Sequence, residues 1–435
     1  MSLHDSFVLL LQSLVPIMTA PSFANFRVIV TGWVFAGRHT ITQMLIAAKA
    51  VGTKHHSAYH RLFAAARWSR DRMGLAVFDL IQTGLSGTIF LAVDDTLARK
   101  RGLKMFGTGM HHDPLLSSRS KTVTNWGHSW VVLGVIVTFP LWPDRAFCLP
   151  ILFRLYLNTK RAQKERRCYR SRPELAVEMI DLLCRHAKSR RFHVVADSAY
   201  GGQSVLKFLP ANCDLTSRLL LKARLYAAPP ERKAGTNGRP RKRGPRLPTP
   251  EVMLQDRARR LILSIYGRKE KARLCDAEAR VYAVPERALR VVAVEALEGG
   301  RGREAFYSTC VDATAEQILS WYARRWSVEV AFHDSKQYLG FEEPQGWTRN
   351  AVERTAPVAM LLYSLIVLWF VREGHRYYHV ASCPWYRSKA RPSFRDMLLT
   401  LRRESIHQQV SSLGLSGQGS RKVLELLENA VSQAV

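Results

Sequence analysis

Residues 314–340 read TAEQILSWYARRWSVEVAFHDSKQYLG and predict a single amphipathic helix of about seven turns. Thr314 and Gln317 have the spacing of a capping box, and Gly340 stands where such a helix would end. Four polar side chains fall within one stripe of roughly 60° on this helix: Tyr322, Arg325, Glu329 and Lys336. Four apolar side chains occupy another face: Trp321, Val328, Phe332 and Leu339. The apolar face would anchor the helix and hold the polar stripe rigidly toward a substrate.

Two apolar segments upstream of this helix each run into aspartate. Residues 88–93 precede the pair Asp94 and Asp95, and residues 192–196 precede Asp197. Three further segments extend the pattern: strands at 128–139 and 147–156 and a helix at 173–190. Together they predict an α/β sheet with carboxylates at strand ends, where the chain leaves the sheet and side chains are free for chemistry.

Each of these acidic residues has a simpler explanation when it is taken alone. Arg325 and Glu329 lie four residues apart and could form a surface ion pair worth about 0.3 kcal/mol. Asp94 and Asp197 could act as helix N-caps or turn formers. The combination of two strand-end aspartates with a helical glutamate favours a shared site.

The charge balance of the chain is strongly basic. Lys plus Arg number 65 against 35 Asp plus Glu, so the formal net charge is +30, while 47% of the residues are hydrophobic. This composition excludes a disordered tail protein, a collagen-like fibre and a coiled coil. It favours a polyanionic partner, nucleic acid first, with an anionic membrane surface or an RNA-rich assembly as alternatives. A basic enzyme of no special affinity would show the same balance.

Cysteine and histidine spacing gives no sign of a zinc site. The seven cysteines are scattered and include no Cys-x-x-Cys pair, which is typical of a reducing compartment. His55, His56 and His60 have no cysteine nearby, so we expect them at the surface or facing phosphate.

Two apolar stretches bear on membrane association. Residues 7–20 resemble the apolar part of a signal peptide but lack its basic start, so we expect an amphipathic helix. Residues 356–371 fall short of the ~20 residues needed to cross a bilayer, so we expect a buried core helix. A membrane-associated basic protein is the weaker alternative.

The chain divides by pattern into five regions. These are a helical N-terminal region at 1–85, a first α/β core segment at 86–224, a basic loop and β-rich insertion at 225–310, a second core segment at 311–375 and a basic helical C-terminal region at 376–435. The first region predicts either a DNA-binding module or a packed helical pair with a solvated basic face. In the loop, the side chains expected to bind a phosphate backbone are Arg239, Arg241, Lys242 and Arg243. A solvated basic linker is the alternative.

Carboxylates are the preferred ligands of hard divalent cations. Asp94, Asp197 and Glu329 could hold two such ions, whose coordination shells would be completed by water and substrate phosphate. Two ions about 3.5 to 4 Å apart assist in-line phosphoryl transfer, which is the chemistry of nucleases and strand-transfer enzymes. The ions would also let carboxylates lie beside DNA, because they reverse the local charge.

The same residues carry a resemblance to a known family. Tyr322-x-x-Arg325-x-x-x-Glu329, followed seven residues later by Lys336, resembles the Tyr-Arg-Glu-Lys signature of DDE transposases from bacterial insertion sequences. VDDT at 93–96 and VADSAY at 195–200 resemble the first and second aspartate motifs of that group. The resemblance extends over about residues 26–370, most of the chain.

The resemblance implies a ribonuclease-H-like mixed sheet flanked by helices and interrupted by a β-rich insertion, after a helical N-terminal region. Asp94, Asp197 and Glu329 would be the catalytic acids and the ligands of two Mg²⁺ ions, for which Mn²⁺ could substitute. Asp95 is the alternative first ligand, since neighbouring strand residues point to opposite faces. The side chains implied to contact DNA near the ends of the element are Tyr322, Arg325 and Lys336.

The implied function is that of a transposase that binds the inverted repeats of its element, cuts the ends and joins them to target DNA. It would act in the bacterial cytoplasm, on the nucleoid, as a homodimer in the complex that pairs the two ends. The alternative from another class is a non-catalytic, sequence-specific DNA-binding protein derived from a transposase. Metal-dependent cleavage of DNA distinguishes the two.

Overall fold

The computed structural model describes residues 1–118, 120–231, 239, 241–265, 268–297, 302–379 and 391–412. The chain forms two compact units, each assembled from separate parts of the sequence. The first unit comprises residues 1–85, 95–170 and 329–435, and the second comprises residues 86–94 and 171–328. Strand β1 (Ile89–Arg99) and helix α11 (Trp326–Leu339) contribute residues to both units. The five regions drawn from the sequence stay a prediction, and the region at 376–435 lies partly outside the described residues.

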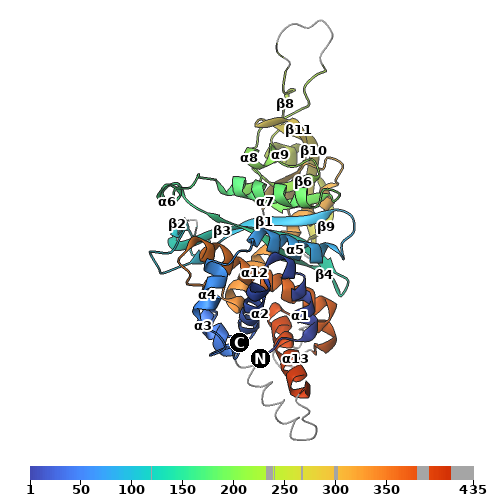
Figure 1. The fold of residues 1–435 in the computed structure, drawn as a ribbon. Helices are drawn as coiled ribbons and strands as arrows, with labels where there is room; N and C mark the ends of the chain where they lie inside the picture. The colour runs from blue at the N-terminus through green and yellow to red at the C-terminus, as the bar shows by residue number, and fades with distance from the viewer. Residues whose placement is uncertain are drawn as a thin grey trace. The chain divides into compact units, whose positions relative to one another are not determined.

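Most of the first unit is helical. Besides most of α11, its α-helices are α1 (Asp5–Gln12), α2 (Ala20–Phe35), α3 (Ile41–Ala47), α4 (Ser57–Ala64), α5 (Arg70–Gln82), α6 (Thr159–Lys164), α12 (Arg349–Arg372) and α13 (Phe394–Ser412). Helix α12 contacts α1, α4, α5 and α13, and every residue from 355 to 370 is buried (Figure 1). The first unit is therefore built around the buried stretch of one helix.

The buried helix expected at 356–371 is confirmed, but its length was wrong. Helix α12 has 24 residues and is long and apolar enough to cross a membrane, yet 89% of its apolar stretch is buried inside the protein. Its first turns carry the charged residues Arg349, Glu353 and Arg354. They lower the local hydropathy, so the start of the helix could not be recognised from the apolar pattern. The amphipathic helix expected at 7–20 forms α1 and a 3₁₀ turn (Val15–Ile17), with Phe7 and Leu11 fully buried.

The strands of the first unit lie against α12. Strands β3 (Thr124–Phe139) and β4 (Trp142–Tyr156) pair in antiparallel fashion along most of their length, and β2 (Gly109–His112) pairs with the start of β3. Strand β3 also lies beside β1. Helix α12 packs on β4, where the Ser364 hydroxyl donates to the Pro150 carbonyl at 2.8 Å.

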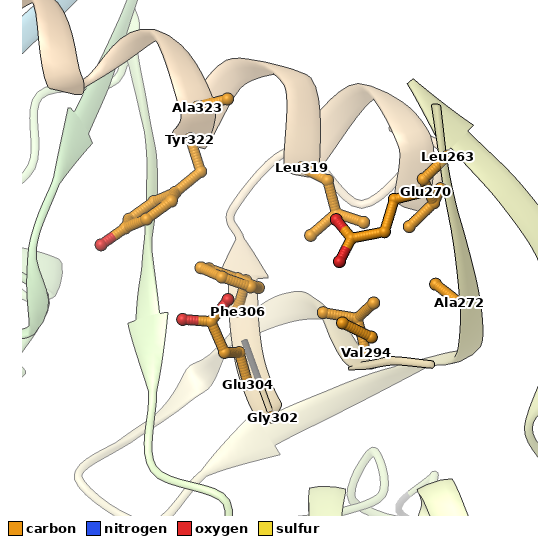
Figure 2. Close-up of a pocket in the computed structure, with 11 residues that line it drawn as sticks. Leu263, Glu270, Ala272, Val294, Gly302, Glu304, Phe306, Leu319, Tyr322 and Ala323 are labelled. Atoms are coloured by element: carbon orange, nitrogen blue, oxygen red, sulfur yellow. The ribbon is translucent and has the colours of Figure 1, made fainter. Parts of the chain in front are cut away.

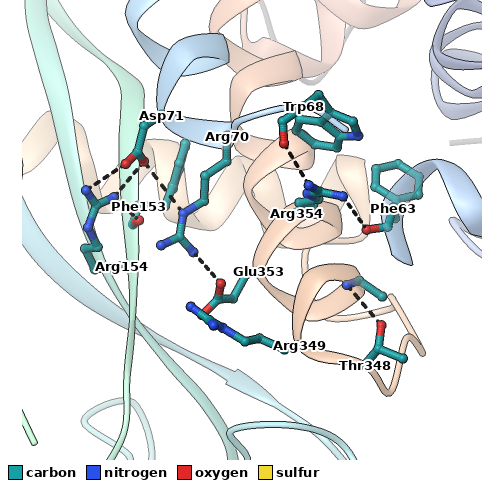
Figure 3. Close-up of polar contacts among 11 residues, drawn as sticks. Phe63, Trp68, Arg70, Asp71, Phe153, Arg154, Thr348, Arg349, Glu353 and Arg354 are labelled. Carbon is teal, nitrogen blue, oxygen red and sulfur yellow. Dashed lines mark hydrogen bonds and ion pairs between the residues drawn. The ribbon is translucent and has the colours of Figure 1, made fainter. Parts of the chain in front are cut away.

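A network of ion pairs ties α5 to β4 and α12 (Figure 3). Both terminal nitrogens of Arg154 donate to the Asp71 carboxylate, at 2.7 and 3.0 Å. Arg70 lies 3.4 Å from the Glu353 carboxylate. Arg154 is almost fully buried, so these charges need their partners, since a buried unpaired charge is costly.

The second unit is a mixed sheet covered by helices. Its strands are the first half of β1, β5 (Phe192–Ala196), β6 (Cys213–Leu219), β7 (Leu225–Tyr226), β8 (Arg246–Leu247), β9 (Arg259–Ile265), β10 (Arg268–Val281), β11 (Val284–Ala296) and β12 (Arg303–Ser308). Strands β1, β5 and β6 are parallel neighbours. The antiparallel strands β12, β11 and β10 continue the sheet from β6, so the predicted β-rich segment extends the core sheet. Helices α7 (Arg172–His186), α8 (Gln203–Leu206), α9 (Pro250–Asp256) and α10 (Ala315–Arg324) complete the unit.

Three predictions of local structure were wrong. Strand β1 does not end at residue 93 but runs to Arg99, because β3 lies alongside it. There the backbones approach so closely that a Cβ on Gly127 would lie 2.3 Å from the Ala98 carbonyl oxygen. Residues 314–340 form two helices rather than one. Finally, the basic loop expected at the start of the region 225–310 contains β7, β8 and the start of α9.

Both ends of the helix predicted at 314–340 were predicted correctly. Thr314 and Gln317 form the capping box that begins α10, and Gly340 follows α11 with a φ of 56°. The break falls at Arg325, whose backbone N–H donates to Tyr322 three residues back instead of four. The predicted polar stripe is therefore divided, with Tyr322 on α10 and with Glu329 and Lys336 on α11.

Candidate active site

Asp94 and Asp197 follow equivalent positions on two neighbouring parallel strands. The last register pair of β1 and β5 joins Val93 to Ala196. Asp94 is the next residue of β1, and Asp197 directly follows β5. Neighbouring strands lie about 4.8 Å apart. The sheet of the second unit therefore places the backbones of these two residues side by side.

The Asp94 carboxylate forms an ion pair with an arginine side chain. Arg325 Nη1 donates to Asp94 Oδ2 at 2.7 Å, and the two side chains are only 14% and 17% exposed. The spacing of Arg325 and Glu329 in the sequence did not predict this contact between Arg325 and Asp94.

Asp197 leaves its strand and begins a short 3₁₀ turn (Ser198–Tyr200). Its Oδ1 accepts from the Ala199 backbone N–H at 2.7 Å, and its backbone carbonyl accepts from the Ser217 hydroxyl at 2.8 Å. The N-cap role that was the simpler explanation of this residue is thus observed. These two hydrogen bonds hold Asp197 at the end of β5.

Helix α10 is anchored on the strands that carry the aspartates. The Trp321 ring lies 4.5 Å from His193 of β5 and 5.5 Å from Phe90 of β1, measured between ring centroids. Burial lowers the pKa of His193 to about 4, and its Nε2 lies 2.7 Å from the Thr216 hydroxyl. Sequence reasoning missed His193, although a histidine within the apolar segment 192–196 was the available signal.

Tyr322 is packed rather than freely exposed. Its ring lies 4.6 Å from the Phe306 ring, and burial raises the pKa of its hydroxyl. A cavity of about 140 Å³ opens beside it, with Leu319, Phe306 and two glutamates, Glu270 and Glu304, in its wall (Figure 2). None of the three predicted catalytic acids lines this cavity. The cavity is therefore separate from the paired aspartates.

Lys336 is held in the first unit against the second half of β1. Its Nζ donates to the Leu97 carbonyl at 2.8 Å and lies 3.6 Å from the Glu342 carboxylate. Burial lowers the pKa of Lys336. The side chain therefore anchors α11 to β1 in this state of the protein.

Glu329 lies in the first turn of α11 and is half-buried. It belongs to the first unit, whereas Asp94 and Asp197 belong to the second. Among the residues that the structure describes, no three His, Cys, Asp or Glu side chains are grouped closely enough to hold a metal ion. The three-ligand site stays a prediction, and the structure brings together its two aspartates.

The basic loop leaves the sheet between β7 and β8. Arg243 is fixed there, with its guanidinium 3.7 Å from the centre of the Tyr282 ring and 5.2 Å from that of Tyr226. The other three basic side chains predicted to bind DNA are exposed: Arg239, Arg241 and Lys242. Arg243 holds the base of the loop, and the exposed three are accessible to a phosphate backbone.

Comparison with known proteins identifies a family for the chain. The family model of the DDE superfamily endonuclease matches residues 15–273, more than half of the chain. The match includes Asp94 and Asp197 but ends before the helices that carry Tyr322, Arg325, Glu329 and Lys336. No curated protein matches the chain. With its two aspartate motifs side by side on parallel strands, the chain belongs to the DDE superfamily of endonucleases, which supports a DDE-type transposase.

Proposed function

We propose that this protein is a transposase that cuts DNA at the ends of its element and joins those ends to target DNA. The observation that carries the proposal is the register of Asp94 and Asp197 in a DDE superfamily member. Glu329 is proposed as the third catalytic acid. In the sequence it lies between Arg325, which contacts Asp94, and Lys336, which contacts Leu97.

The strand arrangement supports a ribonuclease-H-like core. In the first unit β3 lies beside β1 and pairs with β4, and in the second unit β5 and β6 follow β1 in parallel. Helices α6 and α7 lie between β4 and β5 along the chain. The first proposed acid, Asp94, thus lies on a strand that has a neighbouring strand on each side.

The chemistry of the paired aspartates fits divalent metal ions. Carboxylate oxygens are hard ligands, and the Arg325 guanidinium at Asp94 indicates a local potential that attracts cations. We propose that Asp94, Asp197 and Glu329 hold two Mg²⁺ ions, or Mn²⁺ in their place. When bound, the ions would activate the attacking hydroxyl and stabilise the leaving oxygen of the phosphodiester.

The remaining polar residues would orient the acids and bind DNA. Arg325 holds the Asp94 carboxylate by a charge-assisted hydrogen bond and can transfer that interaction to a phosphate when a cation takes its place. Tyr322 and Lys336 are proposed to contact DNA near the element ends. The side chains of the loop proposed to bind the DNA backbone are Arg239, Arg241, Lys242 and Arg243.

The finer parts of the proposal rest on the resemblance and on the net charge of +30. The substrate is proposed to be the inverted repeats of a bacterial insertion sequence, paired by a homodimer of the protein. The protein would work in the cytoplasm, on the nucleoid. Because it neutralises phosphates, its binding should weaken steeply as salt rises.

Cleavage of end-labelled DNA tests the proposal. The substrate is a duplex that carries the inverted repeat flanking the gene, incubated with Mg²⁺, Mn²⁺ or EDTA. We expect cuts at the repeat boundary that require metal and are lost in Asp197→Asn and Glu329→Gln. Asp181→Asn, a change in an exposed ion pair of α7, is the matched control and should cut normally.

Binding without cutting would contradict the catalytic proposal. If the protein binds the repeat tightly and in a salt-sensitive manner but never cuts under either metal, it is a non-catalytic DNA-binding protein derived from a transposase. Full activity in a folded Glu329→Gln protein would remove Glu329 from the site. Thermal unfolding of each variant shows whether a loss of activity reflects a loss of fold.

A further inference from the structure

The turn that follows β5 in the second unit is held at both ends by hydroxyl groups of other strands. Asp197 begins this turn, which comprises Ser198–Tyr200, and Gly201 ends it. The Ser217 hydroxyl donates to the Asp197 carbonyl at 2.8 Å, and the Tyr307 hydroxyl donates to the Gly201 carbonyl at 2.6 Å. The backbone on either side of the turn is therefore fixed to the sheet.

The register of three strands brings the two hydroxyl groups to this turn. Ala196 of β5 pairs with Ser217 of β6, and Ser217 pairs with Tyr307 of β12. Residues that are paired across neighbouring strands carry their side chains on the same face of the sheet. Ser217 and Tyr307 therefore lie in one row with the residue that directly precedes Asp197.

Both supporting side chains are buried. Ser217 is 0% exposed and Tyr307 is 1% exposed. Burial raises the pKa of the Tyr307 hydroxyl, so this group stays protonated and able to donate at neutral pH. Breaking either bond would leave a buried polar group without a partner, which is costly. The turn is therefore held firmly in one position.

The end of the turn packs so closely on these two side chains that it requires glycine. A Cβ on Gly201 would lie 2.2 Å from the Ser217 Oγ and 3.0 Å from the Tyr307 hydroxyl oxygen. A larger residue at 201 would therefore push the turn away from β6 and β12. The close approach and the two hydrogen bonds act together to place the turn.

The position of the turn also sets the position of the Asp197 carboxylate. Asp197 Oδ1 accepts from the Ala199 backbone N–H at 2.7 Å, so the carboxylate is bonded to the turn itself. Ser198 and Ala199 are exposed, and Asp197 is half-buried. The carboxylate is therefore fixed through its own backbone and is still open to solvent on part of its surface.

We propose that Tyr307 and Ser217 are positioning residues, which hold the Asp197 carboxylate in the place where it binds the catalytic metal. The inference rests on the proposed function, because it requires Asp197 to be a metal ligand. Neither hydroxyl touches the ion; both act through backbone carbonyls of the turn. Removing a group that orients a metal ligand typically lowers metal affinity by roughly 10- to 100-fold.

Binding of Mn²⁺ to the full-length protein tests the proposal without relying on DNA cleavage. The electron paramagnetic resonance signal of free Mn²⁺ falls as the ion binds, and a titration gives its dissociation constant. We expect Tyr307→Phe and Ser217→Ala each to weaken Mn²⁺ binding by roughly 10-fold. In cleavage assays, saturating Mn²⁺ should restore the cutting rate of Tyr307→Phe but not that of Asp197→Asn, because only the first variant keeps the acid.

A matched variant separates positioning from a general loss of stability. Tyr59→Phe removes another buried tyrosine hydroxyl, which lies 3.1 Å from the Thr53 hydroxyl in the first unit. Its Mn²⁺ affinity should equal that of the wild type. Thermal unfolding without metal shows whether each variant is folded, and Ser217→Ala decides the question if Tyr307→Phe does not fold.

Three results would overturn the inference and leave the proposed function standing. The first is wild-type Mn²⁺ affinity in the folded Tyr307→Phe and Ser217→Ala proteins. The second is an equal loss of affinity in Tyr59→Phe, and the third is a cutting rate of Tyr307→Phe that saturating Mn²⁺ does not restore. If the wild type cuts no DNA and binds Mn²⁺ no more tightly than Asp197→Asn does, the proposed function fails, and the inference fails with it.

Discussion

Replacing Arg325 should show how much its hydrogen bond to Asp94 contributes to the stability of the protein. In Arg325→Gln the charged partner of Asp94 is replaced by a neutral amide. The contact is a charge-assisted hydrogen bond of 2.7 Å between side chains that are 14% and 17% exposed. Such a bond contributes about 1.5–3 kcal/mol, and partial exposure places the expected loss of unfolding free energy near 2 kcal/mol.

Urea unfolding of a double-mutant cycle measures this contact. The cycle compares Arg325→Gln, Asp94→Asn and the double variant, and we expect a coupling free energy of about 2 kcal/mol. The exposed pair of Arg185 and Asp181 is the control, where the coupling should stay below about 0.5 kcal/mol. A coupling at Arg325 no larger than that of the control would refute the reasoning.

The other predictions concern stability away from the paired aspartates. Asp71→Asn removes the carboxylate that accepts two hydrogen bonds from the buried Arg154 and should cost about 3 kcal/mol in urea unfolding, against less than about 0.5 kcal/mol for Asp181→Asn. Burial alone would raise the pKa of Asp113, but hydrogen bonds from an arginine and an asparagine outweigh it and lower that pKa to about 2. The resulting stabilisation is present above the unfolded pKa of 3.8 and is lost as pH falls from about 4 to about 2, so Asp113→Asn should unfold with a flatter pH dependence there. Thr314→Ala removes the N-cap of α10 and should lower the unfolding free energy by about 1 kcal/mol, whereas no change would mean that the cap is dispensable.

The sequence was most informative where local chemistry decides structure. The capping box at Thr314 and the glycine at 340 were predicted because backbone groups at helix ends need specific partners. The aspartate after β5 was predicted because an apolar run ended there. These features depend on neighbours in the chain, so a single sequence carries them.

Features that depend on distant contacts were not predictable in the same way. Strand β1 continues through Asp94 and Asp95 because β3, contributed from more than 20 residues away, extends the sheet there. The break at Arg325 accompanies its bond to Asp94, 231 residues earlier in the chain.

We propose that Asp94, Asp197 and Glu329 hold the metal of a DNA-cutting site. Metal-directed cleavage of the polypeptide tests this proposal most directly. Fe²⁺ is bound in place of Mg²⁺, and ascorbate with peroxide then generates radicals that cut the backbone beside the ion. We predict three sets of cuts in the same sample, near residues 94, 197 and 329, all suppressed by excess Mg²⁺ and by Asp197→Asn. Cuts that avoid all three positions, or cuts near 94 and 197 without any near 329, would contradict the account.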